Sequence, residues 1–294
     1  MRYRWIKHHR EVFPVAVMCN VLSVSGSGYS GWSQRKPSSQ AQRTRKIRED
    51  IRATFEQSGG VYGSRKIVEA LEKQDTLESA CRNTVAKAMK QLGLRSCVAK
   101  AFKPTTTQAD PTKTPAPNVL DQDFQADGPN RKWVTDITYL PTEAGWVYLA
   151  VVLDLFSRKI VGWAIGTSLA TGLVAQALRR AIELRQPGPG LIHHSDRGSQ
   201  YTSDRYQSIL RGLKITVSMS RKGCCYDNAV CERFFWSLKH EWTNHRAYAD
   251  LADTRQSVFQ YIELFYNRNR LHQALGYVSP EAFEADHAPE IKVA

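Results

Sequence analysis

The sequence predicts an α/β protein in which a mixed five-stranded sheet carries helices on its faces and is preceded by a small, entirely helical region. Three observations lead to this prediction. Positive charge is concentrated in the first third of the 294-residue chain. A Pro- and Thr-rich stretch follows that third, and beyond it the hydrophobic pattern changes from helical to strand-like periodicity. A hydrophobic content of 42% is enough to form a core and excludes a wholly disordered chain.

The charge distribution divides the chain unevenly. The 41 Lys and Arg residues against 28 Asp and Glu residues give a net charge of +13. Residues 1–103 hold 20 basic and 8 acidic residues, whereas residues 104–294 hold 21 and 20. A surplus confined to one segment indicates a module that binds a polyanion, of which nucleic acid is the most common.

A linker is predicted over residues 104–127. Its first part reads PTTTQADPTKTPAP and contains four of the 12 prolines, a composition that favours extended backbone over a packed core. The chain is therefore expected to divide into a basic helical region (1–103), this linker, and a sheet-containing domain with a C-terminal helical extension (128–294).

Three short helices are predicted before the linker. Ile47, Ile51 and Phe55 recur at helical spacing in the first. Ser64 is a candidate N-cap for the second, and Gly93 ends the third. Short helices with short connections and surplus positive charge favour a helix-turn-helix DNA-binding module over a bundle with solvated basic residues. The candidate DNA contacts on these helices are Arg65, Lys66, Arg82, Lys87 and Lys90.

The N-terminus imitates a signal peptide, because basic residues 1–10 precede the apolar stretch 12–24. Polar residues and a proline interrupt that stretch, and the longest apolar run elsewhere, Trp146–Leu153, is too short to span a bilayer. The six cysteines include no C-x-x-C pair, which fits a reducing compartment. We therefore expect a soluble cytoplasmic protein without a membrane partner.

After the linker the pattern predicts five strands and four helices. The strands are expected at Trp133–Leu140, Val147–Leu153, Lys159–Ile165, Leu191–Ser195 and Ile215–Ser218. The helices are expected at Leu169–Leu184, Ser203–Leu210, Asp227–Trp242 and Thr254–Tyr266. Three strands followed by alternating helices and strands predict a mixed sheet with helices on its faces.

Two acidic residues stand at places where solvated surface carboxylates are unusual. Asp136 lies among β-forming residues in WVTDITYL, and Asp196 directly follows the strand LIHHS. Phosphodiester chemistry commonly uses Mg²⁺, which prefers oxygen ligands, so both carboxylates are candidate metal ligands. Taken singly, each is more often a turn residue or a cap.

A third acid lies on the predicted helix DNAVCERFFWSLKHEW. At about 100° per residue, Glu232 falls at the edge of the apolar stripe, and Trp236 and Lys239 follow it along the same edge. The spacing leaves two interpretations open. Either a carboxylate, an aromatic ring and a DNA-contacting lysine line a functional edge, or the edge is an ordinary solvated flank.

The segments WVTDITYL, HHSDRGSQY and KGCCYDNAVCERFFWSLKHE resemble the three acidic blocks of the DDE transposase and retroviral-integrase superfamily. The 35 residues between Asp196 and Glu232 match the spacing by which that superfamily is known. More narrowly, SGSGYSGW, YGSRKI, VYLAVVLDLFSRKIVGWAI and FYNRNRLHQALGYVSPEAF resemble the OrfB product of bacterial insertion sequences of the IS-three group. The resemblance covers nearly the whole chain except the linker. One departure is Cys224, where a small polar residue is expected.

The resemblance implies an RNase H-like integrase catalytic core in residues 128–294, with Asp136, Asp196 and Glu232 as catalytic residues and metal ligands. It implies two Mg²⁺ ions, replaceable by Mn²⁺, and a DNA transposase that cleaves at the ends of an insertion sequence and transfers the 3′-hydroxyl to DNA. The implied partners are terminal inverted repeats, target DNA, further copies of the chain and an upstream-frame product. The implied location is the bacterial cytoplasm, on the nucleoid during activity.

Two other functions remain open on the residues alone. One is an RNase H-like nuclease that cuts without joining, since three carboxylates do not separate cutting from joining. The other is a DNA-binding repressor with a degenerate catalytic domain, against which the intact acids argue. The basic helical region and the extent of the resemblance favour the transposase.

Overall fold

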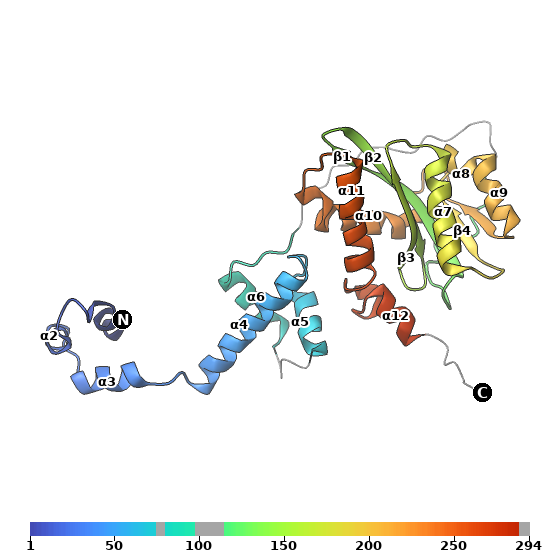
Figure 1. The fold of residues 1–294 in the computed structure, drawn as a ribbon. Coiled ribbons are helices and arrows are strands. Elements are labelled where there is room, and N and C mark those ends of the chain that lie inside the picture. The colour runs from blue at the N-terminus through green and yellow to red at the C-terminus, as the bar shows by residue number, and fades with distance from the viewer. Residues whose placement is uncertain (75–79, 98–114, 288–294) are drawn as a thin grey trace.

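The computed structural model describes residues 1–74, 80–97 and 115–287, and these form three parts along the chain (Figure 1). Two groups of three helices precede an α/β domain that is built on a five-stranded sheet. In Figure 1 the first group lies farthest from the sheet and the second lies between them. This architecture confirms the predicted fold class.

The sheet has the strand order β3-β2-β1-β4-β5. Its strands are β1 (Lys132–Thr142), β2 (Gly145–Asp154), β3 (Ile160–Gly166), β4 (Ile192–Ser195) and β5 (Thr216–Met219). The first three are antiparallel neighbours, whereas β4 runs parallel to both β1 and β5. All five predicted strands are present, and their order and directions are those of an RNase H-like core.

Both faces of the sheet are buried. Along β2, Leu149 and Val151 belong to one hydrophobic cluster, and Ala150 and Val152 belong to another. Successive side chains of a strand point to opposite faces, so a continuous apolar run fits a strand covered on both sides. The run Leu149–Leu153 of β2 is therefore continuously apolar because helices cover each face of the sheet.

One face carries α7 (Thr171–Arg185), α8 (Ser199–Thr202) and α9 (Asp204–Gly212), and the other carries α10 (Ala229–Glu241) and α11 (Leu251–Phe259). The helix α11 continues as a π-helical segment, Gln260–Tyr266, and α12 (Pro280–Asp286) closes the described chain. The four predicted helices are confirmed, and α8 and α12 add to them. Among the described residues, no helix is both long and apolar enough to cross a membrane.

The first group of helices consists of α1 (Arg2–His9), α2 (Val15–Val21) and α3 (Gly26–Gln34). A small apolar cluster holds these helices together, formed by Ile6, Met18, Cys19 and Tyr29. This cluster is separate from the two clusters that flank the sheet.

The second group consists of α4 (Ser39–Gln57), α5 (Ser64–Lys73) and α6 (Arg82–Gln91). Its helices match the three predicted ones, and Gly93, with a φ of +69°, directly follows the turn that ends α6. The predicted N-cap was wrong by one residue, because Gly63 caps α5 and Ser64 is already helical. No side chain accepts a hydrogen bond from the first N–H groups of α5.

The second group contacts the α/β domain directly. The Tyr62 hydroxyl donates a hydrogen bond to the Asn269 carbonyl (2.8 Å) and accepts one from the Leu271 N–H (3.0 Å). Lys73 Nζ donates to the Tyr277 carbonyl at 2.6 Å. The buried residues of α4, α5 and α6 therefore join the same hydrophobic cluster as α10 and α11.

Residues 104–114 of the predicted linker lie outside the described residues. Within 115–127, Leu120 packs against the sheet, because it is 2% exposed and its N–H donates to Ser218 Oγ at 3.0 Å. A segment with few apolar residues can still be held in place by one buried leucine and a backbone hydrogen bond.

Gly162 on β3 allows the close approach of α7. A Cβ at this position would collide with the Ala177 carbonyl oxygen and lie 2.7 Å from Ala181 Cβ. We expect Gly162→Ala to lower the free energy of unfolding of the full chain by about 1–3 kcal/mol, measured by urea titration. Gly172→Ala is the control, because nothing lies within 4 Å of its added Cβ. An unchanged urea midpoint for Gly162→Ala would show that α7 moves away at no cost.

Candidate active site

Asp136 lies on β1, in the middle of the sheet. It shares its face of the strand with Val134 and Leu140, which pack in the cluster that contains α10. Its side chain is partly buried, and Oδ1 accepts a hydrogen bond from the N–H of Ile137 at 2.8 Å. The carboxylate is therefore on the face covered by α10.

Asp196 is brought beside Asp136 by the register of the sheet. Lys132 pairs with Ile192 and Val134 with His194 in the parallel ladder of β1 and β4. The same register, continued beyond the end of β4, places Asp196 next to Asp136. The turn after Asp196 is formed by Gly198, whose N–H donates to Asp196 Oδ1 at 2.9 Å.

Glu232 lies in the first turn of α10 and is exposed. The helix buries Cys231, Phe234 and Leu238 against the sheet, so Glu232 falls at the edge of the buried stripe, as predicted. The start of α10 is tied to β1, because Asn228 Nδ2 donates to the Thr135 carbonyl at 3.3 Å. This contact brings the first turn of the helix to the strand that carries Asp136.

The charges of the three carboxylates converge on Asp136. Burial raises the pKa of Asp136 well above its usual range, and the nearby charges of Asp196 and Glu232 raise it further. The Ile137 N–H and the Asn228 side chain oppose this shift. Burial raises the pKa of the Cys231 thiol, and all three carboxylates add to that effect. The fold therefore brings the three predicted residues into one electrostatic site.

The donor set of this site fits a hard divalent cation. Within the described part of the chain, no three His, Cys, Asp or Glu side chains form a ready-made metal cluster. Neighbouring carboxylates repel one another until a cation offsets their charge. The absence of a ready-made cluster from the described residues is therefore compatible with side chains that come together when an ion binds. All three side chains offer oxygen, the ligand type that Mg²⁺ and Mn²⁺ share.

Lys239 lies near the same site. Its Nζ is 4.4 Å from the centre of the Tyr139 ring, and Tyr139 is on β1 three residues after Asp136. Burial lowers the pKa of Lys239, and the charge of Asp136 opposes that shift. The predicted lysine is thus half-buried and within electrostatic reach of Asp136, not on a freely solvated flank.

The candidate DNA contacts of the second helical group divide into two sets. Arg65 on α5 is exposed, as are Arg82, Lys87 and Lys90 on α6. Lys66, the remaining candidate DNA contact, is half-buried instead, with Nζ 5.2 Å from the centre of the Tyr62 ring. The contact of α5 with the α/β domain covers Lys66, which local periodicity does not reveal.

A hydrogen-bond network before α10 was not predicted. The Asp227 carboxylate is fully buried and accepts from Arg221 Nη2 (2.8 Å), Gln122 Nε2 (2.9 Å) and Asn118 Nδ2 (3.0 Å). The hydrogen bond from Arg221 holds the pKa of Asp227 well below its usual range. Cys224, the one departure from the family pattern, donates Sγ–H to the same carboxylate at 3.4 Å. The signal in the sequence was Asp227 itself, an acid directly before the helix that carries Glu232.

His193 and His194 are both buried in β4, the strand that leads to Asp196. His193 Nε2 lies 3.1 Å from the Tyr206 hydroxyl, and His194 Nδ1 lies 2.8 Å from Ser218 Oγ. Burial lowers the pKa of His193 to about 3 and that of His194 to about 4. Both imidazoles are therefore neutral at pH 7 and serve to anchor β4.

Comparison with protein-family models finds three matches. Two models described as integrase core domain match residues 126–225 and 213–280, and one described as HTH-like domain matches residues 42–102. The integrase matches contain all three converging carboxylates. The HTH-like match contains α5 and α6 and most of α4, which supports the predicted helix-turn-helix region.

Curated relatives match over almost the full length. The chain is 40% identical over 286 residues to the transposase InsF for insertion sequence IS3A of Escherichia coli (strain K12), which covers 97% of this chain and 98% of that protein. It is 38% identical over 266 residues to an uncharacterized 31 kDa protein of insertion element IS600 of Shigella sonnei, covering 90% of this chain and 97% of the relative.

Solved structures of integrases are also similar. The catalytic core domain of HTLV-2 integrase in complex with magnesium, in its trimeric form, has a TM-score of 0.43 at 16% identity and covers 54% of this chain and 99% of that chain. The intasome of simian T-cell lymphotropic virus has a TM-score of 0.46 at 17% identity and covers 74% of this chain and 70% of that chain.

The repulsion at Asp136 has a measurable consequence for stability. When folding raises the pKa of a carboxyl group, the folded protein loses stability as the pH rises through that raised pKa. Ionised Asp136 therefore destabilises the fold at pH 7. In metal-free buffer we expect Asp136→Asn to raise the melting temperature by about 2–4 °C. Adding Mg²⁺ should stabilise the wild-type chain and stabilise Asp136→Asn much less, because a ligand stabilises the state that binds it.

The matched control for this measurement is Glu143→Gln, which removes an exposed carboxylate in the β1–β2 turn. Its melting temperature and its response to Mg²⁺ should equal those of the wild-type chain. Equal responses of Asp136→Asn and the wild-type chain to Mg²⁺ would contradict the assignment of Asp136 as a ligand.

Proposed function

The chain belongs to the transposase family of insertion sequence IS3, as the sequence resemblance predicted, and we propose that Asp136, Asp196 and Glu232 are the catalytic carboxylates of this DNA transposase. They act on phosphodiesters at the ends of the insertion sequence and then on target DNA. The observation that supports this proposal most strongly is geometric: the register of β1 and β4 places Asp196 next to Asp136, and the hydrogen bond from Asn228 to Thr135 brings the start of α10, which carries Glu232, to β1.

We infer that Mg²⁺ is the physiological cofactor, as two ions, with Mn²⁺ as a functional substitute. When bound, the metal activates the attacking oxygen and stabilises the leaving oxygen of an in-line displacement. Asp136, Asp196 and Glu232 would hold the ions through their carboxylate oxygens, which are the ligands that Mg²⁺ and Mn²⁺ prefer. The backbone N–H groups of Ile137 and Gly198 orient Asp136 and Asp196.

Two displacements at phosphorus account for cleavage and joining. In the first, water attacks the phosphodiester at the element end, the bond to the 3′ oxygen breaks, and a 3′-hydroxyl is released. In the second, that hydroxyl attacks a target phosphodiester and replaces the target's own 3′ oxygen. No side chain of the protein forms a covalent bond with DNA, so the carboxylates need only hold charge and geometry.

The helical region 1–103 is proposed to hold the element ends, with the catalytic domain at residues 128–294. Arg65, Arg82, Lys87 and Lys90 are exposed and suited to phosphate contacts. The proposed partners are inverted-repeat ends, target DNA, further copies of the chain on that DNA, and an upstream-frame product. The proposed place of action is the bacterial nucleoid.

The carboxylates are tested by charge-neutral substitutions. Asp136→Asn, Asp196→Asn and Glu232→Gln should each reduce Mg²⁺-dependent cleavage and joining of labelled terminal-repeat DNA by at least about 1000-fold, because each removes a metal-binding charge. Binding of the same DNA should change less than about twofold. Glu143→Gln should cleave at the wild-type rate. Strand joining at the wild-type rate by any of the three variants would remove that residue from the catalytic set.

Lys239 is proposed to position a phosphate close to the scissile bond. Lys239→Ala should slow joining by about tenfold and spread cleavage over neighbouring nucleotides, because a misplaced strand reacts at more than one bond. Lys239→Arg keeps the charge and should retain most activity. Mapping the cleaved ends at single-nucleotide resolution provides the measurement. Cleavage of the same single bond at the same rate and salt dependence by Lys239→Ala would show that Lys239 only packs on Tyr139.

A further inference from the structure

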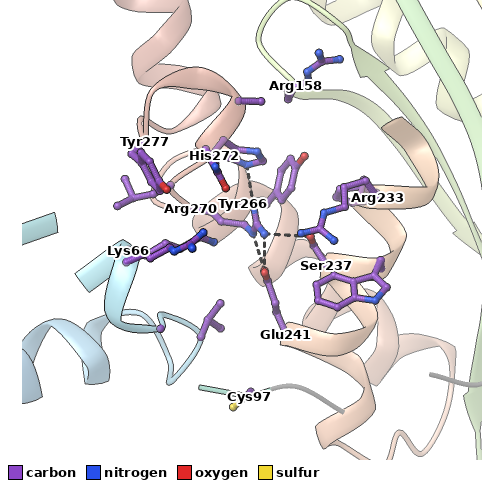
Figure 2. Close-up of a pocket in the computed structure, with 18 of the residues that line it drawn as sticks. Lys66, Cys97, Arg158, Arg233, Ser237, Glu241, Tyr266, Arg270, His272 and Tyr277 are labelled. Atoms are coloured by element: carbon purple, nitrogen blue, oxygen red, sulfur yellow. Dashed lines mark hydrogen bonds and ion pairs between the residues drawn. The ribbon is translucent and has the colours of Figure 1, made fainter. Parts of the chain in front are cut away.

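A cavity of about 960 Å³ lies between the second helical group and the α/β domain (Figure 2). The starts of α5 and α6 line one side, α10 lines another, and residues 270–277 close a third. Figure 2 shows Lys66 reaching from α5 toward the side chains of Arg270 and Glu241. The cavity is large for a small-molecule pocket.

The lining of this cavity is strongly basic. Six basic side chains and one carboxylate are found among the described residues that line it: Arg65, Lys66, Arg82, Arg158, Arg233 and Arg270, with Glu241. The carboxylate is already committed, because Arg270 Nε and Nη2 each donate to Glu241 at 2.6 Å. The charge of the other five basic groups is therefore not balanced by a carboxylate of the lining.

Arg233 lies on α10 and lines the cavity. Its guanidinium lies 4.4 Å from the centre of the Trp236 ring, and that ring stacks on the His240 ring at 4.3 Å. Arg233 also directly follows Glu232 in the chain. A fixed guanidinium beside the catalytic carboxylate is suited to a phosphate group of the substrate.

The charged form of Lys66 is disfavoured in this basic cavity. Burial, and to a lesser extent the charges of Arg270 and Arg233, lower the pKa of Lys66 to about 8. The first residues of α5 line the cavity, their N–H groups have no side-chain cap, and a helix N-terminus adds further positive potential. An anion in the cavity would relieve both effects.

We propose that this cavity binds the phosphate backbone of one DNA strand as the strand runs from the helix-turn-helix region to Glu232. The proposal rests on the proposed function, because it names where the substrate of that site is held. DNA is favoured over a free nucleotide because the basic groups extend from exposed Arg65 and Arg82 to Arg233 beside the catalytic site. One strand can thus contact both parts of the protein.

The first test is the salt dependence of DNA binding by the full chain. The triple variant Arg65→Ala, Arg82→Ala, Arg233→Ala should weaken binding of a labelled inverted-repeat duplex by at least about tenfold. The slope of log K against log salt should fall by about 2–3, since each phosphate contact contributes about 0.9. The loss should be similar for a scrambled duplex, because phosphate contacts carry no sequence information.

Arg179→Ala is the matched control, since Arg179 is an exposed arginine of α7 on the other face of the sheet. It should bind DNA with wild-type affinity and salt slope. Circular dichroism checks that the triple variant is folded. If the triple variant binds with the same affinity and slope as Arg179→Ala, the proposal is overturned.

A second test locates the strand. Acetylation of Lys66, followed by mass spectrometry, should be slowed at least about fivefold by the duplex in the wild-type chain and in Glu232→Gln. Exposed Lys214 should react equally with and without DNA. Protection of Lys66 by dAMP or by a polyglutamate peptide, but not by DNA, would overturn the proposal.

The two tests also separate this proposal from the proposed function. If DNA protects Lys66 from acetylation but the protein does not cleave DNA in Mg²⁺, the catalytic assignment is refuted and DNA binding in the cavity is supported. If the protein cleaves DNA while Lys66 reacts equally with and without DNA, the proposal of DNA binding in the cavity is refuted and the catalytic assignment is supported.

Discussion

The central constraint on this molecule is the mutual repulsion of three carboxylates in a partly buried place. Folding must bring Asp136, Asp196 and Glu232 together although the charges of Asp196 and Glu232 disfavour the ionised form of Asp136. The free energy for this comes from apolar burial on both faces of the sheet, where strands β1 and β2 contact α7 on one side and α10 on the other. Active sites commonly concentrate such strain, which a bound cation relieves.

The helix α10 connects catalysis to the helical region. Its first turn carries Glu232 and is tied to β1 through Asn228, whereas its last turn carries Glu241. Glu241 forms a bidentate ion pair with Arg270, and the next residue, Leu271, donates to the Tyr62 hydroxyl beside α5. One helix thus carries a proposed catalytic carboxylate at its start and, at its end, a residue of the interface with the helical region.

Periodicity in the sequence predicted all five strands because each is a short run rich in β-forming residues, and it placed Glu232 at the edge of the buried stripe of α10. It did not predict the burial of Lys66, the packing of Leu120 or the network at Asp227. These three depend on segments far apart in the chain, and the pattern of neighbouring residues carries no information about them. The role of Asp196 needed both the turn at Gly198 and the resemblance, because a single acid after a strand is more often a turn residue.

The charges along α10 suggest the direction in which the proposed DNA strand would run. Arg233 lies on the side of Glu232 that faces the cavity, and Lys239 lies two turns further along, over Tyr139 of β1. A strand that enters from Arg82 therefore meets Arg233, passes the carboxylates and reaches Lys239. In the proposed arrangement, basic groups on both sides of the acidic site would hold the backbone by its phosphates and so would place the scissile phosphate where negative charge alone would repel it. The three proposed metal ligands would then be left to bind the cation, because their basic neighbours would supply the attraction for DNA.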